Sequence, residues 1–183
     1  DIRISGPGVL EVLSGGDIDL GTGSNLNDGT GTGITAIGNL RNPFLPFEGA
    51  DIITLAGLGA AGGSGPAFGL AGSSLKLADF IQSYLAEPEK FESAYWDRIG
   101  ADTDFDDLTE EQQAIIALER FYKELRKAGR QAAETGEYKR GYKAVRTLFG
   151  GMANGGDILT RSREIRTTNG GSISLGVPDG GIT

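Results

Sequence analysis

The chain of 183 residues contains no cysteine and no histidine, and it has only one methionine and one tryptophan. These absences exclude a disulfide framework, a zinc site of Cys and His ligands, a Cys nucleophile, a Ser-His-Asp triad and a histidine general base. No apolar stretch approaches the roughly 18 residues of a membrane helix, and no signal-peptide pattern opens the chain. Any chemistry must therefore rest on carboxylates, Lys, Arg, Tyr or hydroxyl groups.

Basic charge is also scarce, whereas glycine is abundant. The 25 acidic residues outnumber 17 basic ones, and the net charge of -8 disfavours nucleic acid as a partner of the whole surface. Of the 31 glycines, 18 lie in residues 1–72 and 9 in residues 150–183, while the charged middle of the chain holds only 4. This distribution predicts three segments, 1–72, 73–150 and 151–183, of which the middle one is an insertion.

The glycine-rich flanks repeat a short pattern. The run 15–20 (GGDIDL) recurs at 155–160 (GGDILT) and at 170–175 (GGSISL), and looser copies begin at Pro7 and Gly49. Each copy reads as a glycine turn followed by a short strand in which Ile or Leu alternates with polar residues. Strands this short cannot bury a face alone, so the copies must stack on one another.

Stacked copies predict a mainly β fold, a parallel β-helix, with a β-sandwich as the alternative. In this interpretation Ile18, Ile52, Ile158 and Ile173 point into one core. The strands of residues 1–60 then pair with those of residues 155–183.

The middle segment predicts four amphipathic helices that form a small bundle interrupting the β structure. Their expected caps or first residues, in chain order, are Ser74, Pro88, Thr109 and Thr135. Thr109 and Gln112 have the spacing of a capping box, in which each side chain satisfies a backbone amide of the other. Gly129 is expected to end the third helix and Gly150 the fourth, and Tyr142 is expected to be buried.

Basic residues concentrate in the third and fourth predicted helices. Eight of them are candidates for a binding face that would take an acidic glycan, a lipid headgroup or nucleic acid: Lys123, Arg126, Lys127, Arg130, Lys139, Arg140, Lys143 and Arg146. The alternative is a solvated surface, because helix C-termini favour bases and Glu124, Glu134 and Glu137 lie among them.

The acidic run 102–107 (DTDFDD) has the D-x-D-x-D spacing of a calcium loop. An EF-hand requires Gly at its sixth position and a bidentate Glu at its twelfth, and Asp107 and Gln113 stand there instead. The glycine clusters also lack the G-x-x-x-x-G-K-[ST] pattern of a phosphate loop. Neither a metal site nor a cofactor site is predicted.

Paired carboxylates can cleave polysaccharides without histidine, so a β-helix lyase or hydrolase that uses Asp17, Asp19 and Arg166 is the enzymatic alternative. However, Asp17, Asp19, Asp51 and Asp157 are interpreted as recurring at one place in the repeat. A repeated position is typical of a structural turn, whereas a catalytic set is unique. The pattern therefore predicts no catalytic residue and no enzyme.

Residues 138–149 (YKRGYKAVRTLF) are followed by 156–158 (GDI), 162–167 (SREIRT), 170–175 (GGSISL) and 178–181 (PDGG). This order resembles the helical-insert region of filamentous-haemagglutinin-like large exoproteins, the passengers of bacterial two-partner secretion. The match extends over residues 74–183, and residues 1–60 are similar to the generic glycine-rich segments of such passengers. The chain departs from the family at Glu164, where Gln is usual, and at Asp179, where Gly is usual.

The resemblance implies a right-handed parallel β-helix (a solenoid) interrupted by a helical bundle, secreted or held at the bacterial cell surface. It also implies export in the unfolded state through an outer-membrane two-partner-secretion transporter, to which the lack of disulfides is suited. The expected function is that of a structural and binding segment of an adhesin-like exoprotein that attaches to host cells, surfaces or glycans. Such a segment needs no cofactor and does not span the membrane.

Overall fold

A computed structural model describes residues 1–22, 31–39, 42–59, 69–100, 103–150 and 155–183. The chain divides into two compact units. Asp1–Ala60 together with Met152–Thr183 form the first, called here the β unit, and Ala61–Gly151 form the second, called the helical unit. The junctions thus lie near residues 61 and 152, whereas the glycine content places them at 73 and 151.

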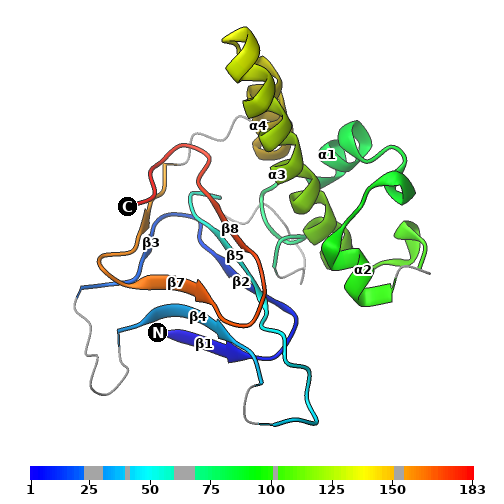
Figure 1. Cartoon of the computed structure of the whole chain (residues 1–183). Coiled ribbons are helices and arrows are strands. Elements are labelled where there is room, and N and C mark those ends of the chain that lie inside the picture. Colours follow the sequence, from blue (N-terminus) through cyan, green and yellow to red (C-terminus); the bar gives the residue numbers. More distant parts are fainter. Residues whose placement is uncertain (23–30, 40–41, 60–68, 101–102, 151–154) are drawn as a thin grey trace. The chain divides into compact units, whose positions relative to one another are not determined.

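The β unit contains three short parallel sheets, each built from strands that are distant in the sequence. β1 (Ile2–Ser5), β4 (Gly33–Ile37) and β7 (Glu164–Thr167) form one sheet, visible side by side in Figure 1. The second sheet contains β2 (Val9–Leu13), β5 (Asp51–Leu55) and β8 (Ile173–Gly176). The third contains β3 (Ile18–Asp19) and β6 (Ile158–Leu159).

The strand register confirms the predicted pairing between residues 1–60 and 155–183. Ile18 pairs with Ile158, and Ile52 pairs with Ile173. Ile18, Ile52 and Ile158 are buried, and the partly buried Val12 packs against residues from both clusters of the apolar core. The prediction is wrong for Ile173, which is 42% exposed because β8 lies at the edge of its sheet.

The predicted fold class, a mainly β right-handed parallel β-helix, is wrong. The strands form three separate short sheets, none of which closes or continues as a solenoid, and about 36% of the structure is helical. The chain is therefore mixed α/β. The repeated pattern correctly indicated parallel pairing. However, its few copies supply only two or three strands to each sheet. The helices of the insertion make up most of the regular secondary structure.

The helical unit is organised around one long helix, α3 (Glu110–Thr135). The α-helices α1 (Leu77–Tyr84), α2 (Ala94–Gly100) and α4 (Lys139–Phe149) pack against it, and the 3₁₀ turns η1 (Pro88–Lys90) and η2 (Phe105–Asp107) connect them. At the centre of the unit, the ring of Phe121 on α3 makes edge contacts with Phe80 and Phe149. These edge-to-face contacts add to the burial of the rings and fix how α1 and α4 meet α3.

The ends of the helices follow local backbone chemistry. The capping box of Thr109 and Gln112 is confirmed, since each side chain bonds the other's backbone N–H. The prediction that Gly129 ends the helix is wrong: α3 continues to Gly136, which adopts φ 74° as left-handed caps require. A glycine inside a helix costs only about 1 kcal/mol relative to Ala, and the good helix formers that follow Gly129 outweigh that cost.

Four further predictions concern the ends of the helices and the burial of Tyr142. Gly150 ends α4 in the left-handed conformation, as predicted. Ser74 does not cap α1, which begins after Lys76, and Pro88 begins only the single turn η1. Tyr142 is 61% exposed rather than buried, because α4 uses the side that contains Ala144 and Leu148 for packing.

Candidate functional site

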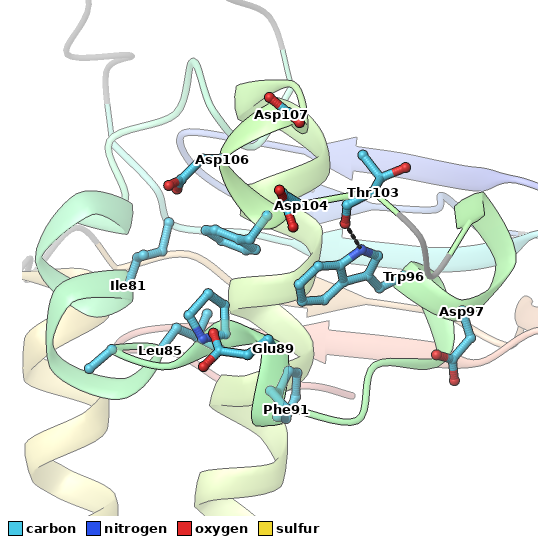
Figure 2. Close-up of a pocket in the computed structure, with 13 residues that line it drawn as sticks. Ile81, Leu85, Glu89, Phe91, Trp96, Asp97, Thr103, Asp104, Asp106 and Asp107 are labelled. Atoms are coloured by element: carbon cyan, nitrogen blue, oxygen red, sulfur yellow. Dashed lines mark hydrogen bonds between the residues drawn. The ribbon is translucent and has the colours of Figure 1, made fainter.

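The helical unit contains an open groove of about 750 Å³, shown in Figure 2. Apolar side chains from α1, η1, α2 and η2 form its floor: Ile81, Leu85, Pro88, Phe91, Trp96 and Phe105. Carboxylates from η1, α2 and the η2 segment form its rim: Glu89, Asp97, Asp104, Asp106 and Asp107. This set of residues is called here the acidic groove.

A network of hydrogen bonds holds the floor of the acidic groove in place. The indole Nε1 of Trp96 donates to the carbonyl of Thr103 at 3.1 Å, and the rings of Trp96 and Phe105 lie 5.7 Å apart. Gln113 on α3 donates to the carbonyl of Phe105 at 3.0 Å, which fixes η2 against the start of α3. The backbone N–H of Trp96 donates to Ser93 Oγ at 3.0 Å. The floor is therefore built by the packing of the unit and does not depend on a ligand.

Of the described residues that line the acidic groove, none is basic. Within the described part of the chain, none of its five carboxylates takes part in an ion pair. Among the same residues, no three or more acids converge closely enough to hold a metal ion. The acids are spread around the floor, so they create a negative field over an apolar surface rather than a chelating site.

A smaller recess of about 360 Å³ shares Leu85 and Phe91 with the acidic groove. At its base lies Glu124 on α3, whose side chain is 2% exposed. Both carboxylate oxygens accept hydrogen bonds from Arg140 on α4, and Arg120 lies 3.7 Å away. These bonds from Arg140 hold the pKa of the Glu124 carboxyl below its usual range, against the opposite effect of burial.

Three of the eight predicted bases have partners within the helical unit. Arg140 is committed to Glu124, and Lys139 pairs with Glu137 at 2.8 Å. Lys123 donates to the carbonyl of Glu92, and its Nζ lies 4.5 Å from the centre of the Phe91 ring.

The other five predicted bases are exposed, and no ion pair engages them within the described residues. They lie on the helical hairpin formed by the consecutive helices α3 and α4, and they are called here the hairpin bases: Arg126, Lys127, Arg130, Lys143 and Arg146. On α3, Arg126 and Arg130 are one turn apart and share one side of the helix, away from the buried Ala128. Lys143 and Arg146, three residues apart on α4, also share one side of their helix, away from the buried Ala144. The structure thus distributes these bases as two strips, one along each helix.

Sequence reasoning did not find Arg120 or the acidic groove. Asp104, Asp106 and Asp107 belong to the acidic run for which the sequence predicts no metal site, and Asp102 of the same run lies outside the described residues. The available signal was the only tryptophan of the chain, Trp96, which stands among acidic residues and two phenylalanines.

The aspartates of the repeat bind backbone groups in the turns of the β unit. The carboxylate of Asp17 accepts from the N–H of Asp157, that of Asp157 from Gly181, and that of Asp51 from Ser172. Asp19 instead accepts from Arg161 at 3.0 Å and from the N–H of Gly21, and both contacts lower the pKa of its carboxyl. Asp17, Asp51 and Asp157 therefore join segments that are distant in the sequence, and Asp19 also bonds a neighbouring backbone N–H.

The fold and these surfaces define a mixed α/β chain that has an acidic groove and two strips of bases on its helical unit. Comparison of the chain with protein-family models, curated proteins and solved structures gave no match. Among the described helices, none has the length and apolar character needed to cross a membrane.

Proposed function

We propose that this chain is a structural and binding segment of a secreted or surface-exposed adhesin-like exoprotein, exported through an outer-membrane two-partner-secretion transporter. The ligand is an acidic glycan on a host cell or other surface. The observation that supports this proposal is the set of hairpin bases, which are exposed and have no ion-pair partner in the described chain.

Arginine and lysine without internal partners suit a sulfated or carboxylated polysaccharide. Guanidinium groups form paired hydrogen bonds with planar or tetrahedral oxyanions, and ammonium groups add point charges. One turn of helix separates Arg126 from Arg130, so one polyanionic chain can contact several bases in succession. Because the whole chain carries a charge of -8, an acidic glycan must bind at the hairpin bases alone, and its affinity must fall as the salt concentration rises.

The test is a binding isotherm of the full chain on heparin, a densely sulfated glycan. The variant carries Arg126→Gln, Arg130→Gln and Lys143→Gln. Each exposed charge contact contributes about 0.2–1 kcal/mol, so three lost contacts predict about tenfold weaker binding.

The control variant carries Lys76→Gln, Lys90→Gln and Arg166→Gln, which change the net charge equally but lie outside the hairpin bases. It should bind within about threefold of the wild type, in line with the small contribution of exposed charges. Equal losses in the two variants, or no binding by the wild type, would contradict the proposal. Release of reducing or unsaturated sugar ends would favour the polysaccharide-cleaving alternative.

A further inference from the structure

We propose that the acidic groove is a docking site for a basic peptide segment of a partner protein, in which Arg or Lys alternates with apolar residues. This inference does not depend on the glycan proposal, because it concerns different residues and a ligand of opposite charge. Three properties of the groove support this inference: its volume, its apolar floor and its carboxylates, which form no ion pair within the described residues.

The size and floor of the groove match a peptide. Its volume of about 750 Å³ lies in the range of small-ligand sites, and its floor is already formed in the free chain. Trp96 is 8% exposed and Phe105 is 7% exposed, so little of either ring is open to the groove, and Phe91, which is half-buried, has Lys123 and Arg120 over its ring. With Ile81 and Leu85 beside them, these side chains form an apolar surface that suits aliphatic side chains better than a stacked sugar ring.

The rim selects for positive charge. In Figure 2, Asp106 and Asp107 lie at one end of the labelled side chains, Glu89 lies between Leu85 and Phe91, and Asp97 lies to one side on α2. Asp104 stands at the N-cap position of η2, yet its carboxylate makes no cap hydrogen bond, so it is available to a ligand.

Like charges placed around an apolar floor repel one another, and none of the described residues that line the groove is basic, although Lys123 and Arg120 lie over the ring of Phe91. A ligand that brings two or three cations together with apolar side chains satisfies both parts of the site. Arginine suits the rim best, because its guanidinium bonds a carboxylate through two parallel N–H groups. An acidic glycan is repelled by the same rim, so the acidic groove and the hairpin bases cannot share a ligand.

Trp96 provides a readout that is specific to this site. It is the only tryptophan of the chain and it lines the groove, so its fluorescence reports occupancy. The probe is the peptide acetyl-Arg-Leu-Arg-Leu-Arg-amide, titrated into the full chain. We expect a saturable change in Trp96 emission that weakens as salt rises. Acetyl-Glu-Leu-Glu-Leu-Glu-amide should give no change, and acetyl-Arg-Gly-Arg-Gly-Arg-amide should bind at least fivefold more weakly.

The matched variants separate the rim from general charge. Asp104→Asn with Asp107→Asn should weaken the Arg-Leu peptide at least tenfold, with unchanged helical circular dichroism. Asp79→Asn with Glu134→Gln removes the same charge from exposed positions outside the groove and should leave binding within twofold. The proposal is overturned by equal losses in both variants, by no saturable change, or by equal binding of the Glu-Leu peptide. It is also overturned if Trp96 emission depends on protein concentration alone, since the occupant would then be a second copy.

Discussion

Removal of Arg140 should destabilise the helical unit far more than removal of the glutamate it binds. Arg140→Ala leaves the Glu124 carboxylate, 2% exposed, with only Arg120 at 3.7 Å. Breaking a buried pair costs about 3–5 kcal/mol when a charge is stranded, and we reduce this to about 2–3 kcal/mol because the Arg140 side chain is 48% exposed.

Glu124→Met strands no buried charge, since Arg140 can turn to solvent and Arg120 keeps its bond to the Tyr84 carbonyl at 3.1 Å. Its expected cost is about 1 kcal/mol, because a residue of similar volume replaces the buried carboxylate. Arg146→Ala is the matched control on α4 and should change stability by less than about 0.5 kcal/mol.

The assay is denaturant unfolding followed by helical circular dichroism, repeated as a function of pH. In the wild type the Glu124 pKa lies below its ordinary value of 4.5, so the pair stabilises the fold fully above that pH. This contribution falls as pH drops through the lower pKa of the folded state. The cost of Arg140→Ala should therefore shrink in acid, where the stranded carboxyl is protonated. A cost no larger than that of Arg146→Ala, or one independent of pH, would refute the reasoning.

Two further predictions concern packing within each unit. Gly129→Ala should stabilise α3 by up to about 1 kcal/mol, since its new Cβ would lie 4.0 Å from the Tyr138 ring. Gly141→Ala should instead destabilise α4 by about 1–2 kcal/mol, since its Cβ would overlap the same ring. Stabilisation by both substitutions in denaturant unfolding would show that the ring moves freely. Ile158→Asp should abolish strand circular dichroism because it buries an unpaired charge beside Ile18, while Ile158→Val should cost about 1 kcal/mol. Retention of the strand signal by Ile158→Asp would mean that this core does not hold the β unit together.

The sequence predicted the pairing of the β unit better than its architecture. Alternating Ile after a glycine turn indicated that strands of residues 1–60 pair with those of residues 155–183, and the structure adds the register in which Ile18 lies opposite Ile158. The pattern could not indicate how many copies would stack or whether the sheets would continue, because a short strand acquires its neighbours only through packing. The extrapolation from repeat to solenoid therefore failed.

The helical unit shows the same limit. The capping box at Thr109 is local, so four residues of sequence were enough to place the start of α3. Its end was misplaced because Gly129 and Gly136 are both plausible stops, and the choice depends on the residues between them.

For the candidate sites, the density of bases in the third and fourth predicted helices indicated a basic surface, but not that Arg140 would be committed to Glu124. The acidic groove needs α1, η1, α2 and η2 together, and no short pattern describes that arrangement.

The central claim of the account is attachment to surfaces through the hairpin bases. The most direct measurement counts beads coated with the full chain that remain on cultured cells after washing, before and after enzymatic removal of sulfated glycosaminoglycans. We predict that wild-type beads attach and lose most of that attachment after the enzyme treatment. Beads that carry Arg126→Gln, Arg130→Gln and Lys143→Gln should attach poorly to untreated cells, while the Lys76, Lys90 and Arg166 control attaches normally. Attachment that survives both the enzyme and the hairpin substitutions, or no attachment by the wild type, would contradict the account.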